Sequence, residues 1–432
     1  MSTLKKISRY FAAFGLLCCL STSPASYAEE LQEGFSKERL QRLNIKFNSL
    51  IKNRKNAGFT ALIYRNNKQV HKMSMGWQDI ERKIPMRADS IFRIYSMSKA
   101  ITSIAALILY EEGHFQIDQA VADFIPEFNN IRVYKSGEGD GIKTADLHRP
   151  VTIRDLFIHT SGLTYHFLGN TAVHKLYRQQ GVMPGVEELY PEEGDASAIT
   201  DLDAMVKTLS RIPLLHQPGE RMSYSVSIDV LGRVIEVISG QPLDQFMHER
   251  IFKPLKMKDT GFVLPQEKLN RFTANYSMSD GQIKLIDDPL NSQHQRANRI
   301  HAGGAGLVST AHDYMQFQLM ILNGGKLGSA RILGPKTLDF ALSNHFPIDD
   351  LPRPVWMKQD SHGLGFALAM NPARMGMLTS TGTADWAGAA STFFWIDRNE
   401  NLAAVFMTQD MPIKNNLLIE LGRTLTYQAL VE

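Results

Sequence analysis

The stretch FRIYSMSKAITSIAALILYEEGH, residues Phe92–His114, joins a short polar motif to a long apolar segment. The motif is a Ser-x-x-Lys formed by Ser96 and Lys99, and residues Ala100–Leu109 after it are mostly alanine, isoleucine and leucine. A helix that is apolar on nearly all sides is buried in the protein, and a glycine such as Gly113 suits a helix C-terminus. The stretch therefore predicts a buried helix that begins with this motif.

Two interpretations of the motif are open. Residues three apart on a helix share a face, so Lys99 is expected beside Ser96 with its amine partly removed from water. Desolvation favours the neutral amine. A neutral amine can take the proton of a serine hydroxyl, which is a weak nucleophile without such help. The pair is then a nucleophile with its base; otherwise it is a serine cap followed by an exposed lysine.

Other motifs give weaker indications. Two further Ser-x-x-Lys matches, Ser2/Lys5 and Ser49/Lys52, do not open an apolar segment. The chain has no Gly-x-Ser-x-Gly elbow, and His248 is not followed by the second histidine of a His-Glu-x-x-His zinc motif. The glycine-rich runs SGEGDG and GGAG do not join a strand to a helix as a phosphate loop does. We therefore expect no cofactor and no metal.

The first 28 residues are typical of a secretory signal peptide. A basic start is followed by the apolar run Phe11–Leu20, and small residues stand at Ser26 and Ala28. The alternative is a membrane anchor, but a span needs about 20 apolar residues and this run is shorter. A lipoprotein signal is disfavoured because neither cysteine follows a small residue. We predict cleavage near Ala28 and a periplasmic or secreted protein.

Removal of this segment has two consequences for the mature chain. Both cysteines, Cys18 and Cys19, lie inside it, so the mature protein would have no disulfide and no thiolate site. Three positive charges leave with it, which takes the formal net charge from +3 to 0. A neutral chain offers no electrostatic attraction for nucleic acid or an anionic membrane. We expect neither partner and no stable membrane span, and nothing in the sequence sets an oligomeric state.

The order of the patterns predicts an α+β fold. An amphipathic helix and two strands joined by a polar turn precede the Ser96 stretch, and strand-like runs return near the C-terminus. Between them the chain has long loops, prolines and helical segments. We predict one α/β domain made of residues 29–115 and 301–432, interrupted by a mainly helical insertion domain over residues 116–300.

Two other places have side chains or backbone suited to chemistry. Tyr224 follows a Pro-Gly turn and precedes a helical run, where a nearby lysine would stabilise its phenolate. The alternative is a packed core tyrosine. Small residues from Ala387 to Ala390 precede an aromatic strand and allow a close approach to the backbone, where an N–H can meet an oxyanion. The alternative is a tight turn into a buried strand.

Five segments, in order, resemble the serine β-lactamase-like hydrolases, a family that includes class C β-lactamases, D-Ala-D-Ala peptidases and carboxylesterases. They are FRIYSMSKAITS, PVTIRDLFIHTSGLT, PGERMSYSVSIDVLGRVIEVISG, GGAGLVSTAHDYMQF and WAGAASTFFWID. The resemblance covers nearly the whole mature chain. It implies a β-lactamase/transpeptidase-like fold, in which helices flank an antiparallel sheet and a mainly helical domain is inserted.

The resemblance also implies roles for individual residues. Ser96 would be the nucleophile, Lys99 its base partner and Tyr224 a second proton carrier. The backbone N–H groups of Ser96 and Ala389 would bind the oxyanion, and Trp386 to Gly388 stand where lactamases and peptidases usually have Lys-Thr-Gly or His-Thr-Gly. His159, in HTSGL, is interpreted as a positioned turn residue and not as a general base.

Two departures from the lactamase pattern favour an esterase. The Tyr-x-Asn element ends in Val226, without its amide, and Trp386 replaces the cation that holds a substrate carboxylate. An aromatic side chain cannot pair a buried carboxylate. We predict a carboxylesterase that acts on a small-molecule ester or amide. The alternatives are a β-lactamase or D-amino-acid peptidase, a penicillin-binding-like sensor that acylates once, and an acyltransferase to an acceptor other than water.

Overall fold

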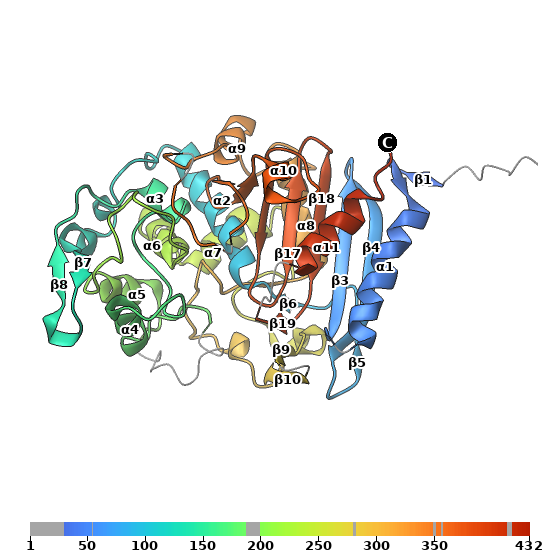
Figure 1. The fold of residues 1–432 in the computed structure, drawn as a ribbon, viewed down its shortest axis with the longest axis horizontal. Coiled ribbons are helices and arrows are strands. Elements are labelled where there is room, and N and C mark those ends of the chain that lie inside the picture. Colours follow the sequence, from blue (N-terminus) through green and yellow to red (C-terminus); the bar gives the residue numbers. More distant parts are fainter. Residues whose placement is uncertain are drawn as a thin grey trace, which may run out of the picture.

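An eight-stranded antiparallel sheet and a group of helices beside it form the two parts of the fold (Figure 1). The protein is described by a computed structural model that covers residues 30–53, 55–186, 199–279, 282–348, 351–355, 357–412 and 417–432. The predicted α+β class is confirmed. The predicted signal segment lies outside the described residues.

The sheet combines the two ends of the chain. Its order is β14-β15-β16-β17-β18-β3-β4-β5, and every neighbouring pair is antiparallel. In this order the strands are Ser361–His362, Ala367–Ala369, Thr383–Ala387, Phe393–Asp397, Leu402–Met407, Gly58–Arg65, Lys68–Asp79 and Ile84–Pro85. Strands far apart in sequence, β18 and β3, therefore lie side by side at its centre.

Local sequence explains the first elements. The predicted amphipathic helix forms as α1 (Lys37–Lys52), and Ser36 caps it by accepting a hydrogen bond from the Arg39 N–H. Asn66 and Asn67 both have positive φ, so they form the tight turn that joins β3 to β4. Helices α1 and α11 (Leu417–Tyr427) pack on one face of the sheet (Figure 1).

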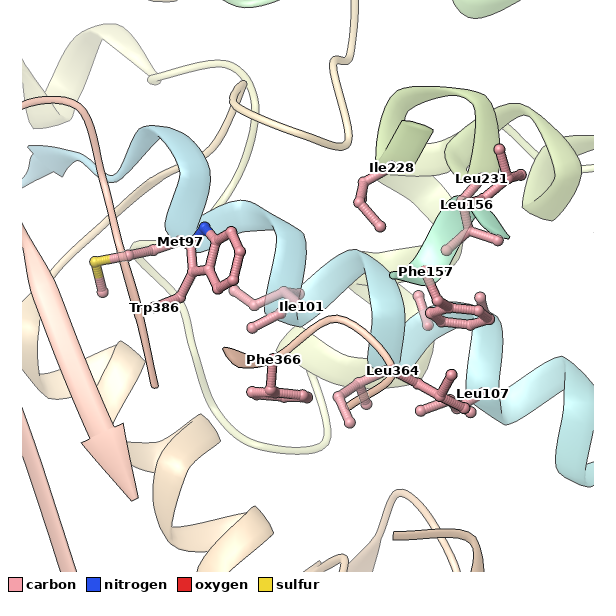
Figure 2. Close-up of a cluster of buried hydrophobic side chains, with 14 of the residues drawn as sticks. Met97, Ile101, Leu107, Leu156, Phe157, Ile228, Leu231, Leu364, Phe366 and Trp386 are labelled. Atoms are coloured by element: carbon pink, nitrogen blue, oxygen red, sulfur yellow. The ribbon is translucent and has the colours of Figure 1, made fainter. Parts of the chain in front are cut away.

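The apolar segment of the Ser96 stretch forms α2 (Ser98–Glu111), whose residues from Ser98 to Leu109 are all buried. Helix α8 (Ala311–Leu322) packs with it on the other face of the sheet. Figure 2 shows side chains of α2 meeting those of α3 (Ile153–Phe157) and α6 (Ser227–Ser239) on one side and Trp386 and Phe366 on the other. Helix α2 is therefore the centre of the core.

The remaining elements complete the helical part and its edges. The helices are α4 (Ala172–Gln179), α5 (Leu202–Leu209), α7 (Leu243–Met247), α9 (Pro335–Ala341) and α10 (Pro372–Met375). The short strands are β1 (Leu31–Gln32), β2 (Phe35–Ser36), β6 (Phe92–Arg93), β7 (Val133–Ser136), β8 (Lys143–Ala145), β9 (Asn275–Ser279), β10 (Gln282–Asp287), β11 (Val308–Ser309), β12 (Lys326–Leu327), β13 (Ala330–Arg331) and β19 (Asp410–Met411).

One strand pair crosses the predicted domain boundary at residue 300. Strand β9 pairs in parallel with β19 and antiparallel with β10. A single hydrophobic cluster also joins α2 and α8 to the helices of residues 116–300. The inserted region is thus tied to the sheet by backbone hydrogen bonds as well as by packing, and its exact limits stay a prediction.

Candidate active site

A cavity of about 270 Å³ opens beside Ser96, between the sheet and the helical region. Its lining is mostly apolar. Six aromatic side chains contribute to it: Tyr95, Tyr165, Phe167, Tyr224, Trp386 and Phe394. Such a lining suits an organic group without charge.

Ser96 lies in a short 3₁₀ turn, Tyr95–Met97, immediately before α2, and not in the helix itself. Tyr95 has a φ of +41°, which is uncommon for a bulky residue. The turn is held from outside, because the Tyr314 hydroxyl of α8 donates to the Met97 carbonyl oxygen at 3.0 Å. The Ile94 N–H donates to the Leu307 carbonyl oxygen at 3.1 Å. These contacts fix the backbone that carries the Ser96 hydroxyl.

Lys99 lies one turn further, with 1% of its surface exposed. Its Nζ lies 3.3 Å from Ser96 Oγ, 2.9 Å from the Tyr165 hydroxyl and 2.7 Å from the Gly304 carbonyl oxygen. These three oxygens surround the Lys99 amine. The helical spacing therefore brings the amine to the serine, and the fold supplies its other two partners.

Tyr224 is the second side chain that contacts Ser96 Oγ. Its hydroxyl lies 2.5 Å from Ser96 Oγ, and Lys99 Nζ lies 4.7 Å from the centre of its ring. Tyr224 is placed by the turn that leads into α6. Three groups that are far apart in sequence thus meet at one hydroxyl.

Tyr165 is a fourth member of this cluster that the sequence analysis did not identify. Besides its bond to Lys99, its ring lies 5.2 Å from that of Tyr224. Burial raises the pKa of Tyr165 well above its usual value, and the negative charge of Asp229 adds to the effect. Tyr165 therefore stays a neutral phenol. In the sequence, Tyr165 directly follows the HTSGLT segment, and this position is the one signal that could have identified it.

The wall opposite the helices is the end of β16. Trp386 lines the cavity with 8% of its surface exposed, and Gly388 and Ala389 follow at its rim. The Gly388 N–H is already bonded to the Thr392 carbonyl oxygen at 2.8 Å. In the part of the chain that the structure describes, the Ala389 N–H has no such partner. Ala389 therefore presents an available backbone donor near Ser96.

The arrangement of Ser96, Lys99 and Tyr224 can be compared with the proteins that this chain is similar to. Residues 46–420 match the family described as Beta-lactamase. The chain belongs to the β-lactamase family. Esterase EstB of Burkholderia gladioli is 30% identical over 390 residues, which cover 85% of this chain and 89% of EstB. A putative D-alanyl-D-alanine carboxypeptidase of Salmonella enteritidis is 27% identical over 409 residues, covering 87% of this chain and 84% of that protein.

Solved structures agree on the fold. EstCE1, described as a hydrolase with promiscuous acyltransferase activity, matches with a TM-score of 0.73 and 24% identity, covering 90% of this chain and 98% of EstCE1. The resemblance inferred from the five segments is confirmed, and as a member of the β-lactamase family the chain is a serine hydrolase.

Val226 does not line the cavity. The Tyr-x-Asn position of the β-lactamase family suggested that it faces substrate, but its surface is fully buried and its side chain belongs to the main hydrophobic cluster. The reason is that Val226 is the residue from which α6 starts, with its N–H directed at the Thr164 carbonyl oxygen. Its contribution is to the packing behind Tyr224.

His159 lies behind the site, as a positioned turn residue with a φ of +57°. Its Nδ1 lies 3.1 Å from Ser225 Oγ, and its ring lies 5.0 Å from that of Tyr224. Burial lowers the pKa of His159 well below its usual value, and the charges of His362 and Lys99 add to the effect. It is a neutral support for Tyr224, with no hydrogen bond to Ser96.

A buried ion pair closes the far end of the cavity. Arg423 of α11 bonds to Asp385 of β16, and Gln359 Nε2 donates to the same carboxylate at 2.8 Å. All three residues line the cavity, and Arg423 also lies 5.4 Å from the Trp395 ring centre. Sequence patterns did not indicate this pair, because its members lie on different elements.

Neither a metal site nor a membrane span is found in the described residues. No group of three or more His, Cys, Asp or Glu side chains there is arranged to hold a metal ion. Over those same residues, no helix combines the length and the apolar character that crossing a bilayer requires.

Proposed function

We propose that this protein is a carboxylesterase that hydrolyses small or short-acyl esters through an acyl-enzyme on Ser96. The observation that supports this most is the wall of the cavity next to Ser96. Trp386 stands there, and the only charged lining residues among those described, Asp385 and Arg423, neutralise each other. A substrate carboxylate would find no unpaired cation, and a buried unpaired charge is costly. An uncharged acyl or alcohol group fits this lining.

Acylation begins at the Ser96 hydroxyl. As Ser96 Oγ attacks the ester carbonyl carbon, its proton passes to Lys99 or Tyr224, which lie within reach at 3.3 and 2.5 Å. The two groups interact closely, so the proton belongs to the pair. The carbonyl oxygen becomes an oxyanion between the N–H groups of Ser96 and Ala389. Collapse breaks the bond to the alcohol oxygen, which takes the proton and leaves.

Deacylation repeats these steps with water. Tyr224 takes a proton from the water that attacks the acyl carbon, and the same two N–H groups bind the second oxyanion. Ser96 Oγ leaves and recovers its proton, and the acid is released. Neutral Tyr165 keeps the Lys99 amine directed at Ser96 throughout.

Two other activities have specific support. The similarity to a putative D-alanyl-D-alanine carboxypeptidase favours a β-lactamase or D-amino-acid peptidase of the same fold. The similarity to EstCE1, a hydrolase with promiscuous acyltransferase activity, favours transfer of the acyl group to an acceptor other than water. The remaining alternative is a sensor that is acylated once and does not release the acyl group.

A substrate panel distinguishes these candidates. Purified protein is assayed with p-nitrophenyl esters of increasing acyl length, a chromogenic cephalosporin and D-Ala-D-Ala peptides, each with and without an alcohol acceptor. We expect kcat/KM to be highest for short esters. Equal or higher efficiency on the cephalosporin would contradict the proposal, and a single-equivalent burst on every substrate would favour the sensor.

We also propose that the protein is exported and starts at Glu29 when mature. The support is the basic start, apolar run and small residues of the first 28 residues. Intact mass of the protein purified from its native host tests this. A full-length cytosolic species, or a lipid on Cys19, would contradict it.

A further inference from the structure

Asp229, a buried carboxylate on α6, is outside the set of residues assigned above. We infer that Asp229 is a positioning residue, which aims the Lys99 amine at Ser96 through the Gly304 peptide and supplies the negative charge that balances it. This inference rests on the proposed function, in which Lys99 serves Ser96. In the proposed mechanism, Asp229 does not contact the substrate.

Two hydrogen bonds connect Asp229 to Lys99 across one residue. Asp229 Oδ1 accepts from the Gly304 N–H at 2.8 Å. The carbonyl oxygen of Gly304 accepts from Lys99 Nζ at 2.7 Å. Asp229 is fully buried and Lys99 is 1% exposed, so water does not compete for either group. The orientation of this short segment therefore determines where the third acceptor of Lys99 lies.

The Gly303–Gly304 segment packs closely against both α6 and α2. A Cβ on Gly304 would lie 2.5 Å from Asp229 Oδ2, and a Cβ on Gly303 would lie 3.0 Å from the Thr102 methyl group. Thr102 of α2 also donates to the Gly303 carbonyl oxygen at 2.6 Å. The two glycines are thus held between α2 and α6, with no room for a side chain. This close approach explains the GGAG run, which has no phosphate-loop geometry.

The charge of Asp229 acts on the same cluster. In the described part of the chain, the titratable groups around the Lys99 amine include Tyr165 and His159 from the segment after α3 and Tyr224 from the turn before α6. An anion disfavours the loss of a proton from groups near it. Removing the charge of Asp229 should therefore move the acidic limb of the pH–activity profile to lower pH.

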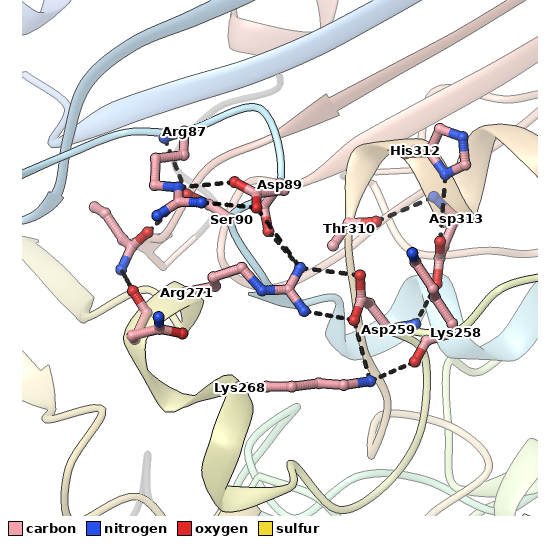
Figure 3. A network of polar contacts seen from close by, with 12 residues as sticks. Arg87, Asp89, Ser90, Lys258, Asp259, Lys268, Arg271, Thr310, His312 and Asp313 are labelled. Atoms are coloured by element: carbon pink, nitrogen blue, oxygen red, sulfur yellow. Dashed lines mark hydrogen bonds and ion pairs between the residues drawn. The ribbon is translucent and has the colours of Figure 1, made fainter.

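Three variants separate charge from position. Asp229→Asn keeps the size and one acceptor but removes the charge, and we expect kcat/KM to fall at least about fivefold and its acidic limb to move about one pH unit lower. Gly304→Ala displaces the peptide and keeps the charge, so kcat should fall while the limb stays. The matched control is Asp313→Asn, which removes another buried carboxylate that accepts from a backbone N–H, that of Asp259 at 2.7 Å (Figure 3).

The readouts keep the inference and the proposed function distinct. The first is the pH profile of kcat/KM for p-nitrophenyl butyrate. The second is the pH profile of Ser96 labelling by a fluorophosphonate, which needs no natural substrate. If the protein does not turn over esters, the esterase proposal is contradicted. The pH profile of Ser96 labelling still tests the role of Asp229 in that case. Three outcomes would overturn the inference: the acidic limb of the pH profile stays in place in Asp229→Asn, it moves equally far in Asp313→Asn, or Gly304→Ala keeps full activity. If Asp229→Asn does not fold, the activity of Gly304→Ala decides whether the inference holds.

Discussion

Gly388 at the end of β16 is in backbone contact with Ile94, two residues before Ser96. A Cβ on Gly388 would lie 2.4 Å from the Ile94 carbonyl oxygen and 2.3 Å from Thr392 Oγ1. The segment after β16, which carries Ala389, and the turn that carries Ser96 therefore pack directly on each other. This contact sets the spacing between the two backbone N–H groups that we assign to the oxyanion.

Replacing Gly388 by alanine should separate these two segments. We expect Gly388→Ala to lower kcat by about 10- to 100-fold with a smaller change in KM, because a misplaced oxyanion donor affects the transition state most. Steady-state kinetics on a short p-nitrophenyl ester measure this. Gly261→Ala is the control, since a Cβ there meets nothing nearer than 3.8 Å. Equal kinetics for both variants would contradict the assignment.

The Ser96 cluster should behave as a unit. Ser96→Ala is expected to abolish turnover and leave the fold intact, since it removes little packing. Lys99→Ala and Tyr224→Phe should each cost several orders of magnitude, and neither should lower activity further in a Ser96→Ala background. Ser49→Ala, in the other Ser-x-x-Lys of the described chain, should be near wild type. Substantial activity in Ser96→Ala would redirect the search to another serine.

Trp386 should govern the preference between neutral and anionic substrates. Trp386→Lys introduces the cation that lactamases and peptidases usually have near this position, so the ratio of kcat/KM for a cephalosporin to that for p-nitrophenyl butyrate should rise. A charge-assisted contact is worth about 2–3 kcal/mol, or roughly 30- to 150-fold in this ratio. Trp386→Phe is the control that changes size without charge, and a similar rise in that variant would refute the pocket assignment.

His362 should make stability depend on pH. Burial lowers its pKa to about 4, from an ordinary value of 6.5. Between these values the unfolded chain takes up a proton that the folded protein does not, so the free energy of unfolding falls as pH drops from 6.5 to 4, by up to about 3 kcal/mol. In His362→Phe the difference in urea midpoint between pH 7 and pH 4.5 should be smaller than in wild type. Exposed His114→Gln should keep the wild-type difference, and an unchanged difference in His362→Phe would refute this.

Arg423 should be essential for stability. Arg423→Met leaves Asp385 buried without its cation, which typically costs about 3–5 kcal/mol. Adding Asp385→Asn removes the stranded charge, so the double variant should regain part of this free energy in urea unfolding. A single variant at least as stable as the double one would show that the carboxylate has another partner or is already neutral.

Local patterns were sufficient for the parts of the site that lie close together in sequence. Ser96 and Lys99 are three residues apart, and the apolar run after them indicated that Lys99 is buried. The cap at Ser36 and the turn at Asn66 and Asn67 were likewise set by residues within a few positions. Family resemblance added Tyr224, which no spacing rule connects to Ser96.

The partners that sequence could not supply are those fixed by tertiary packing. Tyr165, Asp229 and Arg423 sit on separate elements, and only the folded chain brings them to Lys99, Gly304 and Asp385. Val226 was misplaced for the same reason, because a motif gives the order of residues but not the direction of a side chain at a helix start.

Strand β3 precedes the Ser96 stretch in sequence, yet its hydrogen-bonded neighbour is β18, where Ala61 pairs with Phe406. During synthesis, Ser96 and Lys99 leave the ribosome long before the strands that complete the sheet and before Ala389. Such long-range pairing folds slowly. A nascent or truncated chain that ends before β16 therefore holds Ser96 and Lys99 but lacks Ala389, so under the proposed mechanism only a chain that extends past β16 can turn over esters.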